Sequence, residues 1–366
     1  MKTEVLPPVP DAIARACALL AGGEVVALPT ETVYGLAGNA FERESVLKIF
    51  KAKERPSFDP LIVHVSDRIL SSDVDPVEAL AAAGILAGSL KHSPVKEAVL
   101  RAMRTFWPGP LTLVLPKGAK IPDEVTSGEP TVGIRMPAHP LFQKVLGALD
   151  FPLAAPSANR FGRISPTTAD HVFAELSGRI PAILDGGPCA VGVESTIVAV
   201  SEAGLALLRP GKISREELER VFAMPVVQTK GLLEARTHSM STGMPAPGML
   251  DQHYAPVKPL YLYSGPAPGH TEILDFALEN GAAGRAGFLL QRDLSFTGSL
   301  EEAAQKLFSE MRRLDQDPYV DFIVADLPAG TGSGLAAAIA DRLDRASVNK
   351  PLKPRPSPTR RDGRGS

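Results

Sequence analysis

The stretch EVVALPTETVYGLAGNAF (residues 24–41) starts with a short apolar run and becomes polar directly after it. The apolar run predicts a buried strand, and the hydrophilic residues Thr30, Glu31 and Thr32 follow its end. Loops that follow strands in α/β sheets commonly face ligands, whereas a threonine in this place is also a common helix N-cap. The glycines of the stretch are spaced too widely for a dinucleotide-binding or Walker loop. The stretch therefore predicts a strand of an α/β sheet, with a ligand site or a capped helix at its polar end.

Short apolar strands and helical patterns alternate on both sides of this stretch, which is the order expected of an α/β sheet domain. Further strands are predicted at residues 61–65, 111–116, 132–137, 152–155, 182–185, 195–200 and 206–210. Helices are predicted at residues 11–21, 42–52, 95–105, 140–148, 168–176 and 213–222. The last helix carries a capping-box pattern, Ser214 with Glu217, and closes a first domain that spans residues 1–228.

Residues 229–258 lack a clear periodicity and contain several Gly, Pro and Ser, so they are predicted to form a long interdomain linker. A second β-α-β-α-β-α alternation follows, with elements at residues 259–263, 271–280, 286–291, 300–314, 319–328 and 334–346. This order predicts a small doubly wound, Rossmann-like α/β domain over residues 259–350. The tail, residues 351–366, is Pro-rich and basic without apolar periodicity, and it is predicted to be disordered.

The chain has 366 residues and a formal net charge of −2, which argues against a protein that coats nucleic acid or an anionic membrane. This balance still allows a local basic groove. Neither of the two cysteines has the spacing of a zinc motif, and no metal-ligand set is predicted. The N-terminal residues lack the apolar run of a signal peptide, and no stretch of about 18 apolar residues exists. We therefore expect a cytoplasmic protein without a membrane span.

The segment KIFKAKERPSFDPLIVHV (residues 48–65) places several cations at the end of a predicted helix. The simplest interpretation is that these cations complement the helix dipole or form a solvated face. Pro56 disfavours helix at the residue before it, and in an extended chain Lys53 and Arg55 would point to the same side and suit a polyphosphate. His64, which is flanked by apolar residues, is either a core histidine or a ligand-binding one.

Two later segments combine a strand with polar side chains that suit a ligand. In TVGIRMP (residues 131–137) the period of two places Thr131 and Arg135 on one face, where an arginine would suit a carboxylate or a phosphate. A half-buried strand explains the same pattern without any ligand. The segment PLAAPSANRFGRISPT (residues 152–167) leads from a buried strand into a loop with several hydrogen-bond donors, so a plain loop and a binding site both fit it.

Taken together and in this order, the segments resemble the YrdC-like threonylcarbamoyl-AMP synthase family in its long, two-domain form. The resemblance is carried by PTETVYGLAGNA, KAKERPSFDPLIVHV, FWPGPLTLVLP, VGIRMPAHP, PLAAPSANRFGRISPT, VGVESTIV and LLRPGKI, over roughly residues 25–215. It implies a twisted, mixed-sheet first domain with a concave basic groove, followed by the smaller C-terminal α/β domain.

For the groove, the resemblance implies two sub-sites. The threonine sub-site would be formed by Thr32, His64, Arg135, Ala155 and Ser195, and Arg135 would pair with the substrate carboxylate. The ATP sub-site would be formed by Arg55, Asp59, Thr131, Ser157, Asn159, Ser165, Arg209 and Tyr254. Lys53 and Arg55 would be the catalytic cations, and the linker residues His253 and Tyr254 would cover the site.

The implied activity is the condensation of L-threonine, bicarbonate and ATP into threonylcarbamoyl-AMP and pyrophosphate, for a tRNA modification. Mg²⁺ would enter with ATP, a tRNA threonylcarbamoyl-transfer complex would receive the product, and weak RNA binding is a further expectation. A double-stranded RNA-binding module is the alternative function, because related domains present a basic concave face and this chain adds a basic tail. Carbamoyl transfer in hydrogenase maturation is disfavoured, because the acylphosphatase-like and zinc-binding parts of those proteins are not visible in the sequence.

The chain departs from the family's common pattern at three places. Glu54 stands where a glycine is frequent between the lysine and the arginine, and Phe58-Asp59-Pro60 stands where Asp-Asn-Pro is frequent. The linker reads APGMLDQHY, where the family commonly has Ser-Pro-Gly-Met-Lys-Tyr-Arg-His-Tyr.

Overall fold

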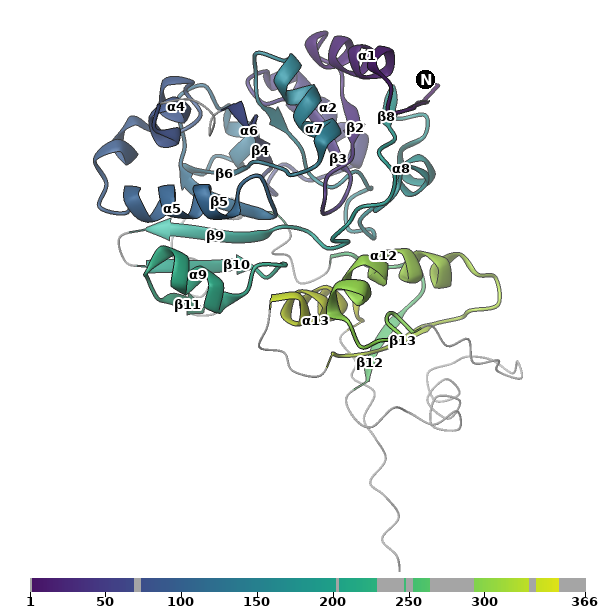
Figure 1. Ribbon diagram of the computed structural model, residues 1–366. Helices are drawn as coiled ribbons and strands as arrows, with labels where there is room; N and C mark the ends of the chain where they lie inside the picture. The colour runs from purple at the N-terminus through teal and green to yellow at the C-terminus, as the bar shows by residue number, and fades with distance from the viewer. Residues whose placement is uncertain are drawn as a thin grey trace, which may run out of the picture.

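The computed structural model describes residues 2–68, 74–201, 204–228, 247, 253–263, 293–328 and 334–348. These residues form a large first part built on one sheet and a smaller second part, which lies at the bottom of Figure 1. Most of the predicted linker, the helix predicted at 271–280, the strand predicted at 286–291 and the tail lie outside the described residues.

The first part is built on a mixed sheet of eleven strands in the order β1-β8-β2-β3-β7-β4-β6-β5-β9-β10-β11. The sheet contains parallel pairs, such as β4 with β6 and β5 with β9, and antiparallel ones, such as β5 with β6. The mixed α/β fold predicted from the sequence is therefore confirmed. The strands are β1 (Glu4–Leu6), β2 (Val26–Leu28), β3 (Gly35–Asn39), β4 (Ile62–His64), β5 (Leu111–Pro116), β6 (Thr131–Arg135), β7 (Leu153–Ala154), β8 (Ala182–Leu184), β9 (Thr196–Ser201), β10 (Gly204–Arg209) and β11 (Val226–Gln228).

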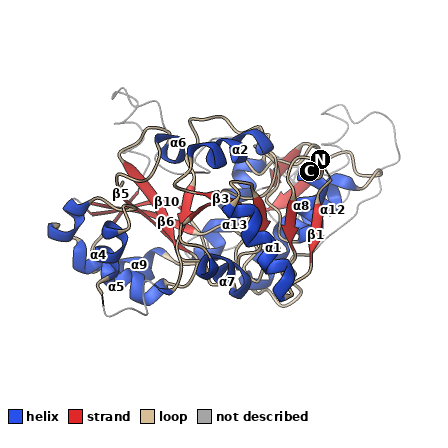
Figure 2. Ribbon diagram, turned by 90° about the horizontal axis from the view of Figure 1, so that it is seen from above, coloured by secondary structure: helices blue, strands red, loops and turns tan. Residues whose placement is uncertain are grey.

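The helices of the first part are α1 (Pro10–Ala21), α2 (Arg43–Lys53), α4 (Pro76–Ala82), the 3-10 helix η1 (Gly88–His92), α5 (Lys96–Phe106), α6 (Asp123–Thr126), α7 (Pro140–Ala148), α8 (Ala169–Leu176) and α9 (Arg215–Phe222). In Figure 2, α2 and α6 lie on one side of the strands, and α1 and α7 lie on the other. The capping box predicted at Ser214 and Glu217 is present at the start of α9. Among the described residues, the structure contains no helix with the length and apolar character of a membrane span.

The two faces of the central strands differ, and β6 shows the difference. Val132 and Ile134 belong to the main hydrophobic core. Thr131 and Gly133 line a pocket, and Arg135 forms polar contacts at the end of the strand. This is the alternation that the sequence predicts for a strand with one core-facing side. This second, polar face carries Thr131 and Arg135 beside a small apolar cluster of Ile62, Val114 and Ile197, and a site can be built on it.

The strand β3 is one that the sequence analysis did not predict. All five of its residues are buried, so no alternation of polar and apolar residues marks it. Its pairing comes instead from antiparallel contacts with β2 and β7. Small residues are needed here, because a Cβ on Gly38 would lie 2.8 Å from the hydroxyl of Ser45 on α2.

The chain at the end of α2 is not extended, contrary to the premise on which Lys53 and Arg55 were predicted to share one side. Lys53 is the last residue of α2, and Glu54 follows in the left-handed conformation with φ 54°. A left-handed C-cap of this kind ends a helix by turning the chain away from its axis. Lys53 and Arg55 are nonetheless both buried.

The second part contains the parallel strands β12 (Leu260–Tyr263) and β13 (Ile323–Asp326) and the helices α12 (Leu300–Gln316) and α13 (Gly334–Ala346). The chain order β12, α12, β13, α13 fits the predicted doubly wound domain. At the start of α12 only half of a capping box is formed. Ser299 accepts a hydrogen bond from the Glu302 amide at 3.3 Å, whereas the Glu302 carboxylate binds Ser295 and Lys306.

Candidate active site

A buried cluster of charges lies around the end of α2. The Lys53 ammonium donates hydrogen bonds to the backbone carbonyls of Ser157, at 2.6 Å, and Asn159. Arg55 forms an ion pair with Asp59 at 2.9 Å and donates to the carbonyl of Pro60 at 2.7 Å. Burial lowers the pKa of Lys53 well below its usual value, and the positive charge of Arg55 lowers this pKa further. The two cations predicted to be catalytic thus lie in one desolvated cluster.

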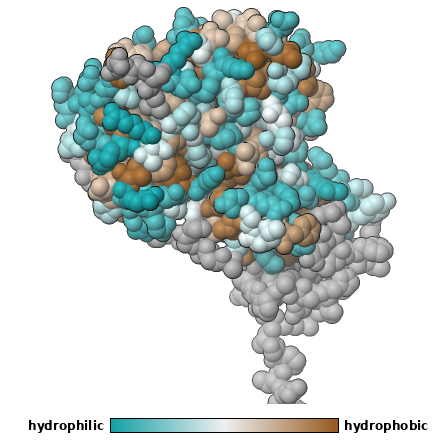
Figure 3. All heavy atoms as spheres, in the orientation of Figure 1, coloured by the Kyte–Doolittle hydropathy of each residue, from teal (hydrophilic) through white to brown (hydrophobic). Residues whose placement is uncertain are grey.

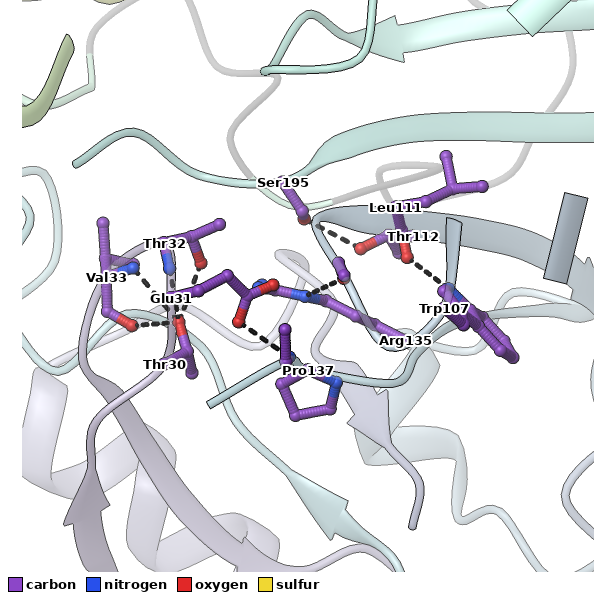
Figure 4. A network of polar contacts seen from close by, with 12 residues as sticks. Thr30, Glu31, Thr32, Val33, Trp107, Leu111, Thr112, Arg135, Pro137 and Ser195 are labelled. Atoms are coloured by element: carbon purple, nitrogen blue, oxygen red, sulfur yellow. Dashed lines mark hydrogen bonds and ion pairs between the residues drawn. The ribbon is translucent and has the colours of Figure 1, made fainter. Parts of the chain in front are cut away.

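Arg209, at the end of β10, joins this cluster to the middle of the sheet. Its guanidinium donates to the carbonyl and to the hydroxyl of Ser195, both at 3.0 Å. The Ser195 hydroxyl also lies 2.8 Å from the hydroxyl of Thr112 on β5, as Figure 4 shows. Thr112 pairs in register with Arg135 of β6. The structure therefore links residues predicted for the ATP sub-site and residues predicted for the threonine sub-site through one serine.

Arg135 is held by a carboxylate and a carbonyl (Figure 4). Its Nη2 donates to Glu31 at 2.6 Å, and its Nε donates to the carbonyl of Gly109 at 3.2 Å. The second oxygen of Glu31 accepts from the Ala138 amide at 3.0 Å. Thr32 lies beside Glu31 in the same loop, fully buried, with its hydroxyl 2.8 Å from that of Thr30. The Arg135 guanidinium has the geometry to bind a carboxylate, as its contact with Glu31 shows. A substrate carboxylate could bind at the same place.

His64 and Ala155 lie near Arg135 but differ in what they offer to a ligand. Nδ1 of His64 lies 3.1 Å from the carbonyl of Ile62, and its ring is 5.2 Å from that of Phe142. Burial and the charge of Arg135 lower the pKa of His64 to about 3, so the imidazole is neutral at physiological pH. The amide of Ala155 donates to the Ile62 carbonyl at 2.9 Å, so this N–H is already engaged.

The loop after β7 supplies backbone groups more than side chains. Its carbonyls at Ser157 and Asn159 accept from Lys53. The Asn159 amide group donates to two carbonyls of its own loop, while its side-chain oxygen is buried without a partner. The Ser165 hydroxyl donates to Glu194, which also accepts from Arg342 of α13 at 2.9 Å. Ser165 is thus committed to a protein partner, and the Asn159 oxygen is a buried polar atom of this loop that a ligand could take.

His253 and Tyr254, from the predicted linker, cover the charge cluster. Both are buried, Nδ1 of His253 has no hydrogen-bond partner, and the hydroxyl of Tyr254 lies beside the Arg209 guanidinium without a well-formed hydrogen bond. Burial lowers the pKa of His253 well below its usual value, and nearby positive charges lower it further, those of Arg55, Lys53, Arg209 and Arg342. Buried polar atoms without partners are rare in native proteins and often mark a site that a ligand or water completes.

A pocket lies on the polar face of the sheet beside this cluster. Its wall includes Thr112 and Val114 of β5, Thr131 and Gly133 of β6, and Pro247. Pro247 is tied to the cluster, because its carbonyl lies 3.5 Å from Arg209 Nη1. The ATP-site prediction for Thr131 therefore falls on a residue that faces a cavity next to the cations.

Sequence reasoning did not find Arg342 and Thr112. Arg342 is fully buried and lies on the apolar stripe of α13, between Ile339 and Leu343. A charged residue on the apolar stripe of a helix is a signal that the pattern contained. Thr112 gave a weaker signal, as a polar residue inside the continuous apolar run of β5.

The donors for a metal ion are few. Within the residues that the structure describes, no group of three or more His, Cys, Asp and Glu side chains is placed to hold an ion. Asp59 is buried, and neither of its carboxylate oxygens accepts a hydrogen bond, although one oxygen is paired with Arg55. Mg²⁺ on nucleotides is usually held by phosphates with one or two carboxylates. Asp59 therefore fits an ion that arrives with a nucleotide.

Two family models match the chain. One, described as "Telomere recombination" for the group Sua5, YciO and YrdC, matches residues 18–211, and the other, "Threonylcarbamoyl-AMP synthase, C-terminal domain", matches residues 213–348. The threonylcarbamoyl-AMP synthase of Bacillus subtilis is 40% identical over 93% of this chain and 94% of its own length. That of Pyrococcus abyssi is 38% identical over 90% of this chain and 92% of its own. The crystal structure of P. abyssi Sua5 complexed with L-threonine superposes with a TM-score of 0.77 at 35% identity, over 94% of this chain and 98% of that one.

Proposed function

The chain belongs to the threonylcarbamoyl-AMP synthase family, and we propose that it condenses L-threonine, bicarbonate and ATP into threonylcarbamoyl-AMP and pyrophosphate. The observation that carries the proposal is the gathering of buried cations about His253, whose Nδ1 has no partner, and about the Tyr254 hydroxyl. In a low-dielectric site, cations without enough counter-charge favour a polyanion such as a triphosphate. The reaction is a nucleotidyl transfer, and a tRNA threonylcarbamoyl-transfer complex would consume its product.

Threonine would bind at the edge of the polar face, where Arg135 and Thr32 lie. Its carboxylate would take a hydrogen bond from Arg135, either beside Glu31 or in place of it. Because His64 is neutral, it would add no charge to this sub-site. Ser195 lies between this sub-site and Arg209. Threonine bound in this orientation would have its amino group on the side of the nucleotide.

ATP would bind among Arg55, Arg209 and Tyr254, with Thr131 in the wall of the adjoining pocket. The two arginines would hold the phosphates. When bound with the nucleotide, Mg²⁺ would neutralise part of the phosphate charge, and Asp59 is the residue that would hold it. Lys53 would act chiefly by its field, because its ammonium is already bonded to two carbonyls.

The chemistry needs positioning more than a protein nucleophile. The amine of threonine attacks bicarbonate, and loss of water leaves an N-carboxylate. An oxygen of that carboxylate attacks the α-phosphate, the bond to the bridging oxygen breaks, and pyrophosphate leaves. Both reactants are anions, so the buried cations lower the repulsion and hold them in line. The cover of His253 and Tyr254 keeps water from the labile product.

The test is an assay of pyrophosphate release by the purified full-length chain, with threonine, bicarbonate or ATP omitted in turn. Release should require all three. Arg55→Lys, which keeps the charge beside Asp59 but loses the two-pronged contact, should lower kcat/KM for ATP at least about tenfold. Lys51→Arg is the matched control, since Lys51 is exposed on α2, the helix that ends just before Arg55. Pyrophosphate release that does not depend on threonine would contradict the proposal, and so would equal kcat/KM values for ATP in the two variants.

The RNA-binding alternative is tested by the same preparation. Salt-sensitive binding of a short RNA duplex, with no threonine-dependent pyrophosphate release, would support that alternative. Hydrophilic and apolar side chains are interspersed on the face seen in Figure 3, which does not single out a polar surface for a nucleic acid. Weak RNA binding together with pyrophosphate release would fit the synthase and a hand-over of its product to tRNA.

A further inference from the structure

One residue of the second part, Arg342 of α13, reaches into the candidate active site. It is 0% exposed, and its Nε donates to the carboxylate of Glu194 at 2.9 Å. Its Nη1 donates to the carbonyl of Pro210 and to Asp341, at 2.8 and 2.9 Å. Its guanidinium carbon lies 5.4 Å from the ring centre of Tyr254. One buried side chain thus contacts two segments of the first part and the covering tyrosine.

Each of these contacts adjoins a residue of the proposed site. Glu194 precedes Ser195 in the chain, and Pro210 follows Arg209. Ser195 and Arg209 are themselves joined by two hydrogen bonds. Arg342 therefore contacts the residue before Ser195 and the residue after Arg209, while its Nη2 is buried without a hydrogen-bond partner.

The covering segment is fastened by the same helix. The His253 amide donates to the carbonyl of Arg345 at 3.1 Å, and the Ala255 amide donates to Gly162 of the first part at 2.8 Å. Tyr254, between them, has φ 64°, a conformation that bulky residues rarely adopt. Such a conformation persists only where its surroundings enforce it, and here the surroundings include the Arg342 guanidinium.

Close packing shows that the second part docks in one defined place. A Cβ on Gly334, at the start of α13, would lie 2.5 Å from the carbonyl of Lys212. A Cβ on Gly192 would collide with the backbone of α12 at Ala304. A second buried arginine, Arg312 of α12, pairs with Glu175 at 3.1 Å and donates to the carbonyl of Ile164. Arg342 thus meets Glu194 and Pro210 within a tight interface.

We propose that Arg342 is a positioning residue for the nucleotide sub-site, and that through it the second part of the chain completes the active site. This inference rests on the proposed function. Arg342 fixes Arg209 through the Pro210 carbonyl, fixes Ser195 through Glu194, and holds the Tyr254 ring over the cations. Loss of Arg342 should act mainly on the affinity for ATP and less on the free energy of unfolding.

The experiment compares three full-length variants with the wild type. Arg342→Lys keeps a cation for Glu194, but one ammonium does not span Glu194, Pro210 and the Tyr254 ring together. Glu194→Gln with Arg342→Met removes both charges, so that no lone buried charge destabilises the protein. Arg312→Met, the matched control, removes another buried interdomain arginine that does not touch Tyr254. The measurements are the melting temperature, the Kd for ATP by calorimetry, and kcat and KM for pyrophosphate release.

Both Arg342 variants should raise the Kd and KM for ATP at least about tenfold, the equivalent of one lost charge-assisted hydrogen bond. Arg312→Met should lower the melting temperature at least as much as the two Arg342 variants do. Its affinity for ATP should stay within about twofold of the wild type. Wild-type ATP affinity in both Arg342 variants, or an equal loss in Arg312→Met, would overturn the positioning role. A wild-type chain that binds ATP but releases no pyrophosphate would refute the proposed function alone, because the affinities still test Arg342.

Discussion

The pair of Arg135 and Glu31 allows a test that separates substrate binding from stability. Their side chains are 5% and 12% exposed, and the ion pair is 2.6 Å long. Arg135→Met leaves the Glu31 carboxylate, whose side chain is 12% exposed, with the Ala138 amide as its remaining hydrogen-bond partner. Breaking one side of a buried pair costs about 3 to 5 kcal/mol, and the remaining hydrogen bond places this case near about 3 kcal/mol. In a domain of this size that predicts a fall in Tm of about 6 to 12 °C.

The double variant Glu31→Gln/Arg135→Met removes this penalty, because no charge is left unpaired. Its Tm should return to within a few degrees of the wild type. Its affinity for threonine should not return, because the substrate carboxylate still lacks its guanidinium. A hydrogen bond to a charged group contributes about 1.5 to 3 kcal/mol, so the Kd for threonine should rise about 10- to 150-fold.

Calorimetric titration with L-threonine and thermal melts of the same samples give both numbers. Arg104→Met is the control, since Arg104 is exposed on α5, away from the sheet face that carries Arg135. If the double variant bound threonine as tightly as the wild type, Arg135 would not be the partner of the carboxylate. If the double variant had a Tm as low as that of Arg135→Met, the unpaired Glu31 carboxylate would not be the cause of the lower Tm.

Three further changes test other features of the site. Glu54→Gly should stabilise the protein by about 0.5 to 1 kcal/mol in urea unfolding, because relief of the left-handed conformation outweighs the exposed ion pair with Arg179; a loss of stability would contradict this. The pKa of His64, about 3 when folded and near 6.5 when unfolded, means that the unfolded chain binds more protons between these values. Stability should therefore fall as the pH drops below 6.5, by up to about 1.4 kcal/mol per pH unit from this group, and His64→Asn should flatten that slope. Tyr254→Phe removes a hydroxyl that lies beside Arg209 without a well-formed hydrogen bond, so the Tm should change little while the KM for ATP rises about fivefold; an unchanged KM would show that the hydroxyl does not meet the nucleotide.

Patterns with a clear period allowed the fold to be predicted where they occur. The strand TVGIR showed which side faces the core, and the structure places Val132 and Ile134 in the core and Thr131 at a pocket. The Ser214 capping box was predicted from the spacing of two residues and is present. In contrast, β3 is buried on both faces and rich in glycine, so no periodicity identified it. Its place in the sheet depends on partners that lie far away in the sequence.

The site shows the same division between local and distant information. The two-residue period of its strand singled out Arg135, whereas Ser195 was predicted from the family resemblance. Which groups each side chain bonds to depends on residues far away in the sequence, and these partners were not predictable. Lys53 bonds to carbonyls more than one hundred positions away in the sequence, and Ser165 is taken by Glu194. Arg342 lies on the apolar stripe of its helix because its counter-ion comes from the other part of the chain.

The near-neutral charge of the chain and the strong positive field at the site are compatible, because burial decides how far a charge acts. Exposed ion pairs such as Arg43 with Glu44 are screened by water and contribute little. The buried cations around His253 are screened far less; burial lowers the pKa of Lys53 most, and the charge of Arg55 lowers it further. Such a cluster is stable only with enough negative charge nearby, and Asp59 and Glu194 supply part of it. A triphosphate would supply the rest, so ATP should raise the melting temperature of the full chain, and should do so less in Arg209→Lys than in Lys51→Arg.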